Sequence, residues 1–369
     1  MMKKIIFWSL CTLLILSSCA PNMDEEEILQ TGEINQETSI VPGIQLSEET
    51  YGIVTPYKTD VARGLITNQI MNHVDIDEIE EGLRRHSKEV FDSSDLYFQE
   101  GQYFTQETLL SWINDLNPER KDNWDEETHR KNPRILSYIL EQNYLRKVEG
   151  NNFELAGISI GISLKSVYRF QAPKDGPDYN EEIEMEVMLE KGYEVAQTVV
   201  ERMREIDGLS DIPIMIALYR EEDHASPVPG NYVAKTNVPS GSNTIKDWES
   251  IDEEHILFPS PEGEEKYLED YELLKSLENE ISPYFPDYVG MIGNGFYANE
   301  ELQKLTIEIP IEFYSDGELL GFMQHAYGQV QYIFDNNYDL EINITSSNQM
   351  VGLISRKAGA ESPTVHIFQ

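Results

Sequence analysis

The thiol of Cys19 is the side chain whose neighbours predict a specific chemistry, because Leu16, Ser17 and Ser18 directly precede it. A Leu three residues before a Cys, with small residues between them, is the pattern of a bacterial lipoprotein signal. In that chemistry the sulfur takes a diacylglyceryl group, and a peptidase whose cleft admits only small side chains cuts before the modified Cys. The spacing therefore predicts lipidation of Cys19, with Leu16, Ser17 and Ser18 recognised by the signal peptidase.

The segment that positions Cys19 has the parts of an export signal. Lys3 and Lys4 supply positive charge, and residues 5–16 form an apolar stretch of 12 residues. That stretch is too short to cross a bilayer core of ~30 Å, which requires about 20 residues. We therefore interpret residues 1–18 as a signal peptide; the alternative is an ordinary secretory signal in which Cys19 occurs by chance.

The residues after the signal predict a membrane anchor without a transmembrane helix. Two acyl chains on one Cys suffice for stable anchoring, whereas a single chain binds only marginally. Residues 20–50 are polar and acidic and cannot bury enough apolar surface to fold alone. We expect residues 19–50 to be the lipidated Cys and a flexible acidic tether, which hold a domain spanning 51–369 at the extracytoplasmic face of the cell membrane.

The composition excludes several classes of function. The formal net charge of −39, which becomes more negative once Lys3 and Lys4 leave with the signal, repels nucleic acid and anionic lipid headgroups. We therefore expect no nucleic-acid partner. Cys11 also leaves with the signal and Cys19 is committed to lipid, so the mature chain has no disulfide and no cysteine nucleophile. The acidity fits binding of cations or basic peptides or, as we prefer, solubility in a salty or polymer-rich environment.

Three patterns resemble catalytic or cofactor motifs but lack the context that each needs. The G-x-S-x-G pattern around Ser159 lies in an alternating run that predicts a strand, not the sharp turn of a serine hydrolase. Residues 293–298 match G-x-G-x-x-A, but a strand predicted near Leu305 leaves no room for a full helix, so we expect a tight turn. The seven histidines form neither H-x-x-x-H nor H-E-x-x-H. We predict no enzymatic activity, no metal and no cofactor.

Hydrophobic periodicity predicts an α+β fold. It contains two strand–helix–strand units, predicted over 155–170, 181–206 and 212–219 and again over 305–314, 318–334 and 338–345. Their similar order is compatible with a diverged internal repeat. Additional N-terminal helices are predicted over 75–91, 105–116 and 134–145, and short strands over 351–355 and 364–368. If the domain has two subdomains, we expect them to divide near 225–290.

Aromatic side chains in predicted turns form the candidate binding surface. Tyr97 and Tyr103 lie in a dense aromatic turn, and Tyr232 lies in a Pro- and Gly-rich loop predicted over 224–241. One interpretation is ordinary packing of these turns. The other is a surface for a ligand or partner, since loops and aromatic side chains often serve binding.

Several segments, taken in order, resemble the CamS family of Gram-positive lipoproteins, the sex pheromone precursor lipoproteins. The segments are YFQEGQYF (97–104), NPRILSYILEQNYL (132–145), IPIMIALYREE (212–222), VPGNYVAKTNV (228–238) and GNGFYANEELQKLTIEIPIEFY (293–314). Together they run along most of the region after the tether.

The resemblance implies two products from one gene. One is the lipidated ectodomain, which we expect to be non-enzymatic or, alternatively, a module that binds a peptide or a cell-wall component. The other is a short apolar peptide cut from the leader, which acts as a pheromone on plasmid-bearing donor cells. By position this peptide would be Thr12, Leu13, Leu14, Ile15, Leu16, Ser17 and Ser18. It departs from the family at Thr12, where a small apolar residue is usual.

Overall fold

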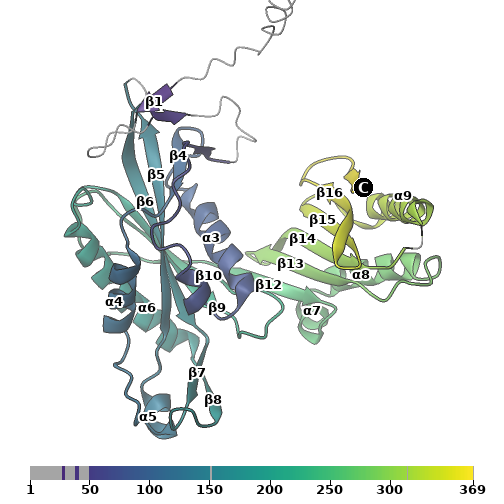
Figure 1. The fold of residues 1–369 in the computed structure, drawn as a ribbon. Helices are drawn as coiled ribbons and strands as arrows, with labels where there is room; N and C mark the ends of the chain where they lie inside the picture. The colour runs from purple at the N-terminus through teal and green to yellow at the C-terminus, as the bar shows by residue number, and fades with distance from the viewer. Residues whose placement is uncertain (1–26, 30–37, 41–49, 150–151, 314, 369) are drawn as a thin grey trace, which may run out of the picture.

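The structure, a computed structural model, describes residues 27–29, 38–40, 50–149, 152–313 and 315–368. Two large sheets, each with its own apolar core, organise these residues and confirm the predicted α+β class (Figure 1). Cys19 and the candidate pheromone segment lie outside the described residues. In the region predicted as a tether, β1 (Glu27–Leu29) pairs antiparallel with β2 (Thr38–Ile40).

The first sheet has seven strands, of which the central ones are long and buried. From edge to edge they are β11 (Glu249–Ser250), β10 (Asn231–Val238), β9 (Ile214–Glu221), β6 (Phe153–Lys165), β5 (Leu136–Lys147), β4 (Leu96–Glu100) and β3 (Gly52–Ile53). Neighbours are antiparallel except for two parallel pairs, β6 with β9 and β3 with β4. The parallel pair at the centre requires a crossover, which the helix α6 (Met185–Arg204) provides.

Side chains of β6 alternate in size, and this alternation sets which helix covers each face of the first sheet. Ile158, Ile160 and Ile162 point to the face covered by α6, while Ser159 and Gly161 point to the opposite face. On that second face α3 (His73–Ser87) lies across the sheet, on the side away from α6 (Figure 1). The small side chains let the α3 backbone approach closely, because successive strand residues face opposite sides.

The remaining elements of the first unit are short. They are α2 (Ile66–Gln69), α4 (Gln106–Asp115), α5 (Glu126–Lys131) and the hairpin of β7 (Val167–Gln171) and β8 (Asp178–Glu182). The Asn72 side chain accepts a hydrogen bond from the Val74 N–H at the start of α3, and Thr105 caps α4 in the same way through Thr108.

The second sheet has six strands in sequence order. They are β12 (Glu253–Phe258), β13 (Ile292–Ala298), β14 (Glu301–Pro310), β15 (Asp339–Ser346), β16 (Gln349–Arg356) and β17 (Thr364–Ile367). Its helices are α7 (Pro261–Lys266), α8 (Leu268–Ile281) and α9 (Asp316–Ile333). Only two residues separate β11 from β12, so a very short connection joins the two units.

The two units repeat one arrangement of strands. In the order β4, β5, β6, β9, β10, β11 the third and fourth strands are parallel and all other neighbours antiparallel, and β12 to β17 have the same sequence of pairings. In each unit one long helix, α6 or α9, joins the two strands of the parallel pair. Two helices also separate the first strand of each unit from the second: α4 and α5 precede β5, and α7 and α8 precede β13. The first unit differs by adding β3, α2, α3 and the β7–β8 hairpin. Connectivity therefore supports a diverged internal repeat.

Two predicted segments have a different structure. Residues 134–145, predicted as a helix, form most of β5, and every residue from Leu136 to Leu145 is buried. A strand covered on both faces loses the alternation that identifies strands, and its apolar residues then imitate helical spacing. The predicted loop over 224–241 contains β10, which lies in the sheet between β9 and the short edge strand β11.

Candidate functional site

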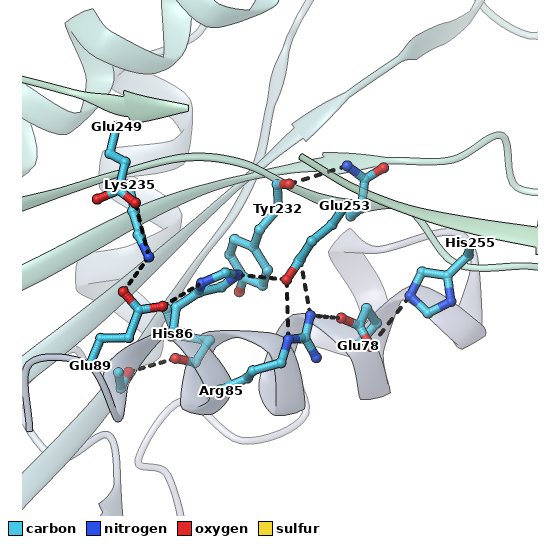
Figure 2. A network of polar contacts seen from close by, with 12 residues as sticks. Glu78, Arg85, His86, Glu89, Tyr232, Lys235, Glu249, Glu253 and His255 are labelled. Carbon is cyan, nitrogen blue, oxygen red and sulfur yellow. Dashed lines mark hydrogen bonds and ion pairs between the residues drawn. The ribbon is translucent and has the colours of Figure 1, made fainter. Parts of the chain in front are cut away.

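A network of charged side chains lies where the two units meet, and we refer to it as the junction cluster. It comprises Glu78, Arg85 and His86 on α3, Glu89 just after α3, Tyr232 and Lys235 on β10, Glu249 on β11, and Glu253 and His255 on β12 (Figure 2). The α3 members come from the same side of the helix, since residues seven or eight apart lie two turns away from one another. Figure 2 shows them pointing toward the first strand of the second unit.

Arg85 is the centre of the junction cluster. Its Nη2 lies 2.7 Å from Glu78 Oε1 and 3.0 Å from Glu253 Oε2, and its Nε donates to Glu253 Oε1 at 3.2 Å. The guanidinium also lies over the ring of Phe296 on β13, 4.4 Å from its centroid. One arginine from the first unit thus holds a carboxylate and an aromatic ring of the second, a combination suited to its planar, multi-donor group.

The histidines extend the cluster on both sides of Arg85. His86 Nε2 lies 3.2 Å from Glu253 Oε1, and His255 Nε2 lies 3.7 Å from Glu78 Oε2. Their rings also contact aromatic side chains, His86 against Tyr232 and His255 against Phe296. Each histidine therefore faces a glutamate of the other unit: His86 faces Glu253, and His255 faces Glu78.

Electrostatics favour ionised carboxylates in the junction cluster despite burial. Burial by itself raises the pKa of Glu78, but the neighbouring His255 side chain and the charge of Arg85 outweigh it, so the pKa is lowered. The pKa of Glu253 is lowered in the same way, with His86 and Arg85 outweighing burial. Burial lowers the pKa of Arg85, and the two glutamates raise it by more. Arg85 thus bridges two largely buried carboxylates, one from each unit, that favour the ionised form.

A hollow of about 540 Å³ opens where the chain leaves α3 and enters β4. It is lined by apolar side chains, among them Phe91 and Leu96, and by charges of both signs, including Asp92, Asp95 and Arg146. Within the described ranges, no group of three or more His, Cys, Asp or Glu side chains could hold a metal ion.

The three tyrosines predicted as one binding surface do not come together. Tyr232 is fully buried, and its hydroxyl donates to the backbone oxygen of Ile79 at 2.7 Å. Tyr97 is partly buried and packs edge-on against Phe153, at 5.0 Å between centroids. Tyr103 belongs to a turn whose N–H groups donate to the buried carboxylate of Glu141. The prediction of a shared aromatic surface is wrong because Tyr232 is buried on the strand β10 and does not lie in a loop.

The motif around Ser159 is structural. Ser159 is fully buried in β6, and its hydroxyl lies 2.7 Å from that of Ser87 on α3. A buried strand serine cannot receive a substrate at an exposed turn, so the serine hydrolase interpretation is excluded. The Gly-rich segment 293–298, predicted as a tight turn, is the strand β13 itself, and Gly293 provides room for Leu274 of α8.

Sequence comparison and structural comparison agree on the relatives of this chain. The family profile described as CamS sex pheromone cAM373 precursor matches residues 57–362. The chain belongs to the CamS family. A sex pheromone precursor from Lactobacillus salivarius has the same fold, with 26% identity, a TM-score of 0.83, and coverage of 90% of this chain and 99% of that one. The C-terminal domain of the sex pheromone staph-cAM373 precursor from Staphylococcus aureus is similar at 26% identity and a TM-score of 0.72, over 82% of this chain and 99% of that one.

The CamS match includes the junction cluster and both sheets except their edge strands β3 and β17, and it confirms the resemblance recognised in the sequence. No curated protein sequence matches the chain significantly. None of the helices in the described ranges is long and apolar enough to cross a membrane. The junction cluster itself was missed by sequence reasoning, since Arg85 and Glu253 are 168 residues apart and neither belongs to a recognisable motif.

Proposed function

We propose that this CamS chain is a lipoprotein anchored through Cys19 to the extracytoplasmic face of the membrane, and that its leader yields a secreted peptide pheromone. The lipoprotein signal that ends at Cys19 supports the anchor. Membership of a family of sex pheromone precursors supports the peptide. The ectodomain acts without catalysis: the serine hydrolase motif is buried, and Arg85 in the junction cluster is engaged in binding glutamates of both units.

The pheromone half of the proposal is tested on spent medium of the native host by mass spectrometry. We expect a released heptapeptide spanning residues 12–18. A matched strain carrying Cys19→Ala should lose the peptide, because cleavage before the modified Cys defines its end. Absence of the peptide from cells that make the lipidated protein normally would reject the pheromone while leaving the anchor intact.

A second function, binding of a peptide by the ectodomain, is favoured by the hollow beside α3. Asp92 and Asp95 suit an amino terminus, Arg146 suits a carboxylate, and Phe91 and Leu96 offer apolar contacts. The probe is the synthetic heptapeptide of residues 12–18, titrated against the full-length chain in detergent. Saturable binding that Arg146→Glu weakens would support this function, and lack of binding would reject it.

A further inference from the structure

In the described residues, one face of the second sheet is not covered by any helix of the second unit, whereas a helix covers the equivalent face of the first sheet. In both units the long crossover helix covers the face that carries the strand isoleucines, such as Ile160 in the first unit and Ile307 in the second. Crossovers of this type are right-handed, so α6 and α9 cover equivalent faces. The opposite face of the first sheet is covered by α3. Among the described residues of the second unit, no such helix covers the equivalent face of the second sheet.

The second unit's own helices pack on the isoleucine face. Leu274 of α8 fills the space beside Gly293, and Met323 of α9 fills the space beside Gly352. On the other side the strand pairings align Asn294 and Thr306 with Glu341, and Glu308 with Asn343 and Leu353. We call this set the helix-free face. Its β12 edge is reached by Arg85, through Phe296 and Glu253.

The helix-free face carries an ordered set of hydrogen-bond acceptors. Asn343, only 6% exposed, donates from Nδ2 to Glu308 Oε1 at 2.7 Å and to Glu341 Oε1 at 3.2 Å. The Oδ1 atoms of Asn343 and Asn294 are buried without a hydrogen-bond partner. Burial and the neighbouring Glu341 raise the pKa of Glu308, whereas Asn343 lowers it, and the net shift is upward. The two neighbouring carboxylates held by Asn343 are relieved by a cationic donor.

We propose that the helix-free face docks a basic, helical segment of a partner protein, with lysine or arginine side chains reaching Glu308 and Glu341. A helix fits because α3 occupies the equivalent face of the first sheet. Basic charge fits because Glu308 and Glu341 outnumber Lys304, which lies 3.3 Å from Glu341. A second copy of this face would set the same carboxylates against each other, and a chain of net charge −39 repels anionic lipid and nucleic acid. The inference is independent of lipidation and of the leader peptide.

The test uses the full-length chain in a non-ionic detergent and a labelled amphipathic peptide of alternating Lys and Leu patches that forms a helix. Fluorescence anisotropy at physiological salt is expected to show saturable binding, while the same peptide with Glu in place of Lys does not bind. The variant Glu308→Gln/Glu341→Gln should weaken binding at least tenfold.

The matched control is Glu269→Gln/Glu272→Gln, which removes the same charge from exposed positions on α8. We expect it to change binding less than twofold, with circular dichroism showing both variants folded. Equal weakening by the two variants would mean non-specific attraction and would overturn the proposal. Absence of saturable binding, or self-association of the chain that Glu308→Gln/Glu341→Gln abolishes, would overturn it as well.

Discussion

Glu221 and Asp75 are buried carboxyl groups in the first unit, and they make stability depend on pH near neutrality. Burial raises the pKa of Glu221 to about 7 and of Asp75 to about 6. Lys165 partly offsets this at Glu221, and the Gly230 N–H and the Tyr219 hydroxyl partly offset it at Asp75. Both groups bind protons in the folded state at pH values where the unfolded chain, with pKa values near 4, has released them.

Stability should therefore fall as pH rises from about 4.5 to about 7, because the folded state binds more protons than the unfolded one in this range. Glu221→Gln should remove most of the Glu221 contribution, roughly 3 kcal/mol over the interval. The measurement is urea unfolding at several pH values, with Glu222→Gln as the control at a neighbouring, less buried position. An unchanged slope in Glu221→Gln would contradict the assignment.

Arg85 offsets the charge of two buried carboxylates. Its removal should lower the unfolding free energy by more than the loss of its hydrogen bonds alone, because the carboxylates stay buried. Arg85→Met leaves Glu78 and Glu253 without their shared partner, and we expect a loss of roughly 2–4 kcal/mol in unfolding free energy. Adding Glu78→Gln and Glu253→Gln to Arg85→Met should recover more than half of that loss, because no uncompensated charge then remains. A triple variant as unstable as Arg85→Met would show that packing, not charge, dominates.

At the scale of elements, the small residues of β6 leave room for α3 and for the loop that follows it. A side chain at Gly157 would place its Cβ 2.0 Å from the Phe91 ring. We expect Gly157→Ala to destabilise the fold by about 1–3 kcal/mol through overpacking. The control is Gly328→Ala in α9, where nothing lies within 4 Å and Ala should stabilise by about 0.5–1 kcal/mol. Thermal unfolding of both variants measures the two changes in stability. Equal changes for Gly157→Ala and Gly328→Ala would contradict the proposed overpacking at Gly157.

Sequence periodicity predicted most of the long elements, including the strands β6 and β9, which are buried on both faces. The helices α6 and α9 carry clear periods and were predicted close to their bounds, whereas the strand predicted over 305–314 overlaps β14 but begins four residues late. The strand β5 is buried on both sides, and it was predicted as a helix for that reason. The junction cluster could not be predicted, because its members become neighbours only after the first sheet places α3 beside β12.

At the scale of the whole molecule, the junction cluster should fix the angle between the two units above about pH 4 and release it in acid. The pKa values of Glu78 and Glu253 are lowered in the folded state by their histidine and Arg85 partners, against the effect of burial. For carboxyl groups with lowered pKa, the stabilisation is fully present above the unfolded value of about 4.3 and is lost as pH falls through the folded value.

Small-angle X-ray scattering of the full-length chain in detergent measures this release. We expect a constant interunit distance from pH 8 to about 5 and a wider distribution below about 4, while circular dichroism remains that of a folded protein. Arg85→Met should show the wider distribution at pH 7 already. An interunit distance that is insensitive both to Arg85→Met and to acid would show that other contacts set the angle.

Intact-mass analysis of the protein extracted from membranes of its native host tests most directly the claim, proposed above, that Cys19 holds this CamS chain at the membrane. We predict a mature chain that begins at Cys19 and carries a diacylglyceryl group, and a Cys19→Ala variant that retains its leader and has no lipid. A mature chain that begins at any other residue, or an unmodified Cys19, would contradict the claim.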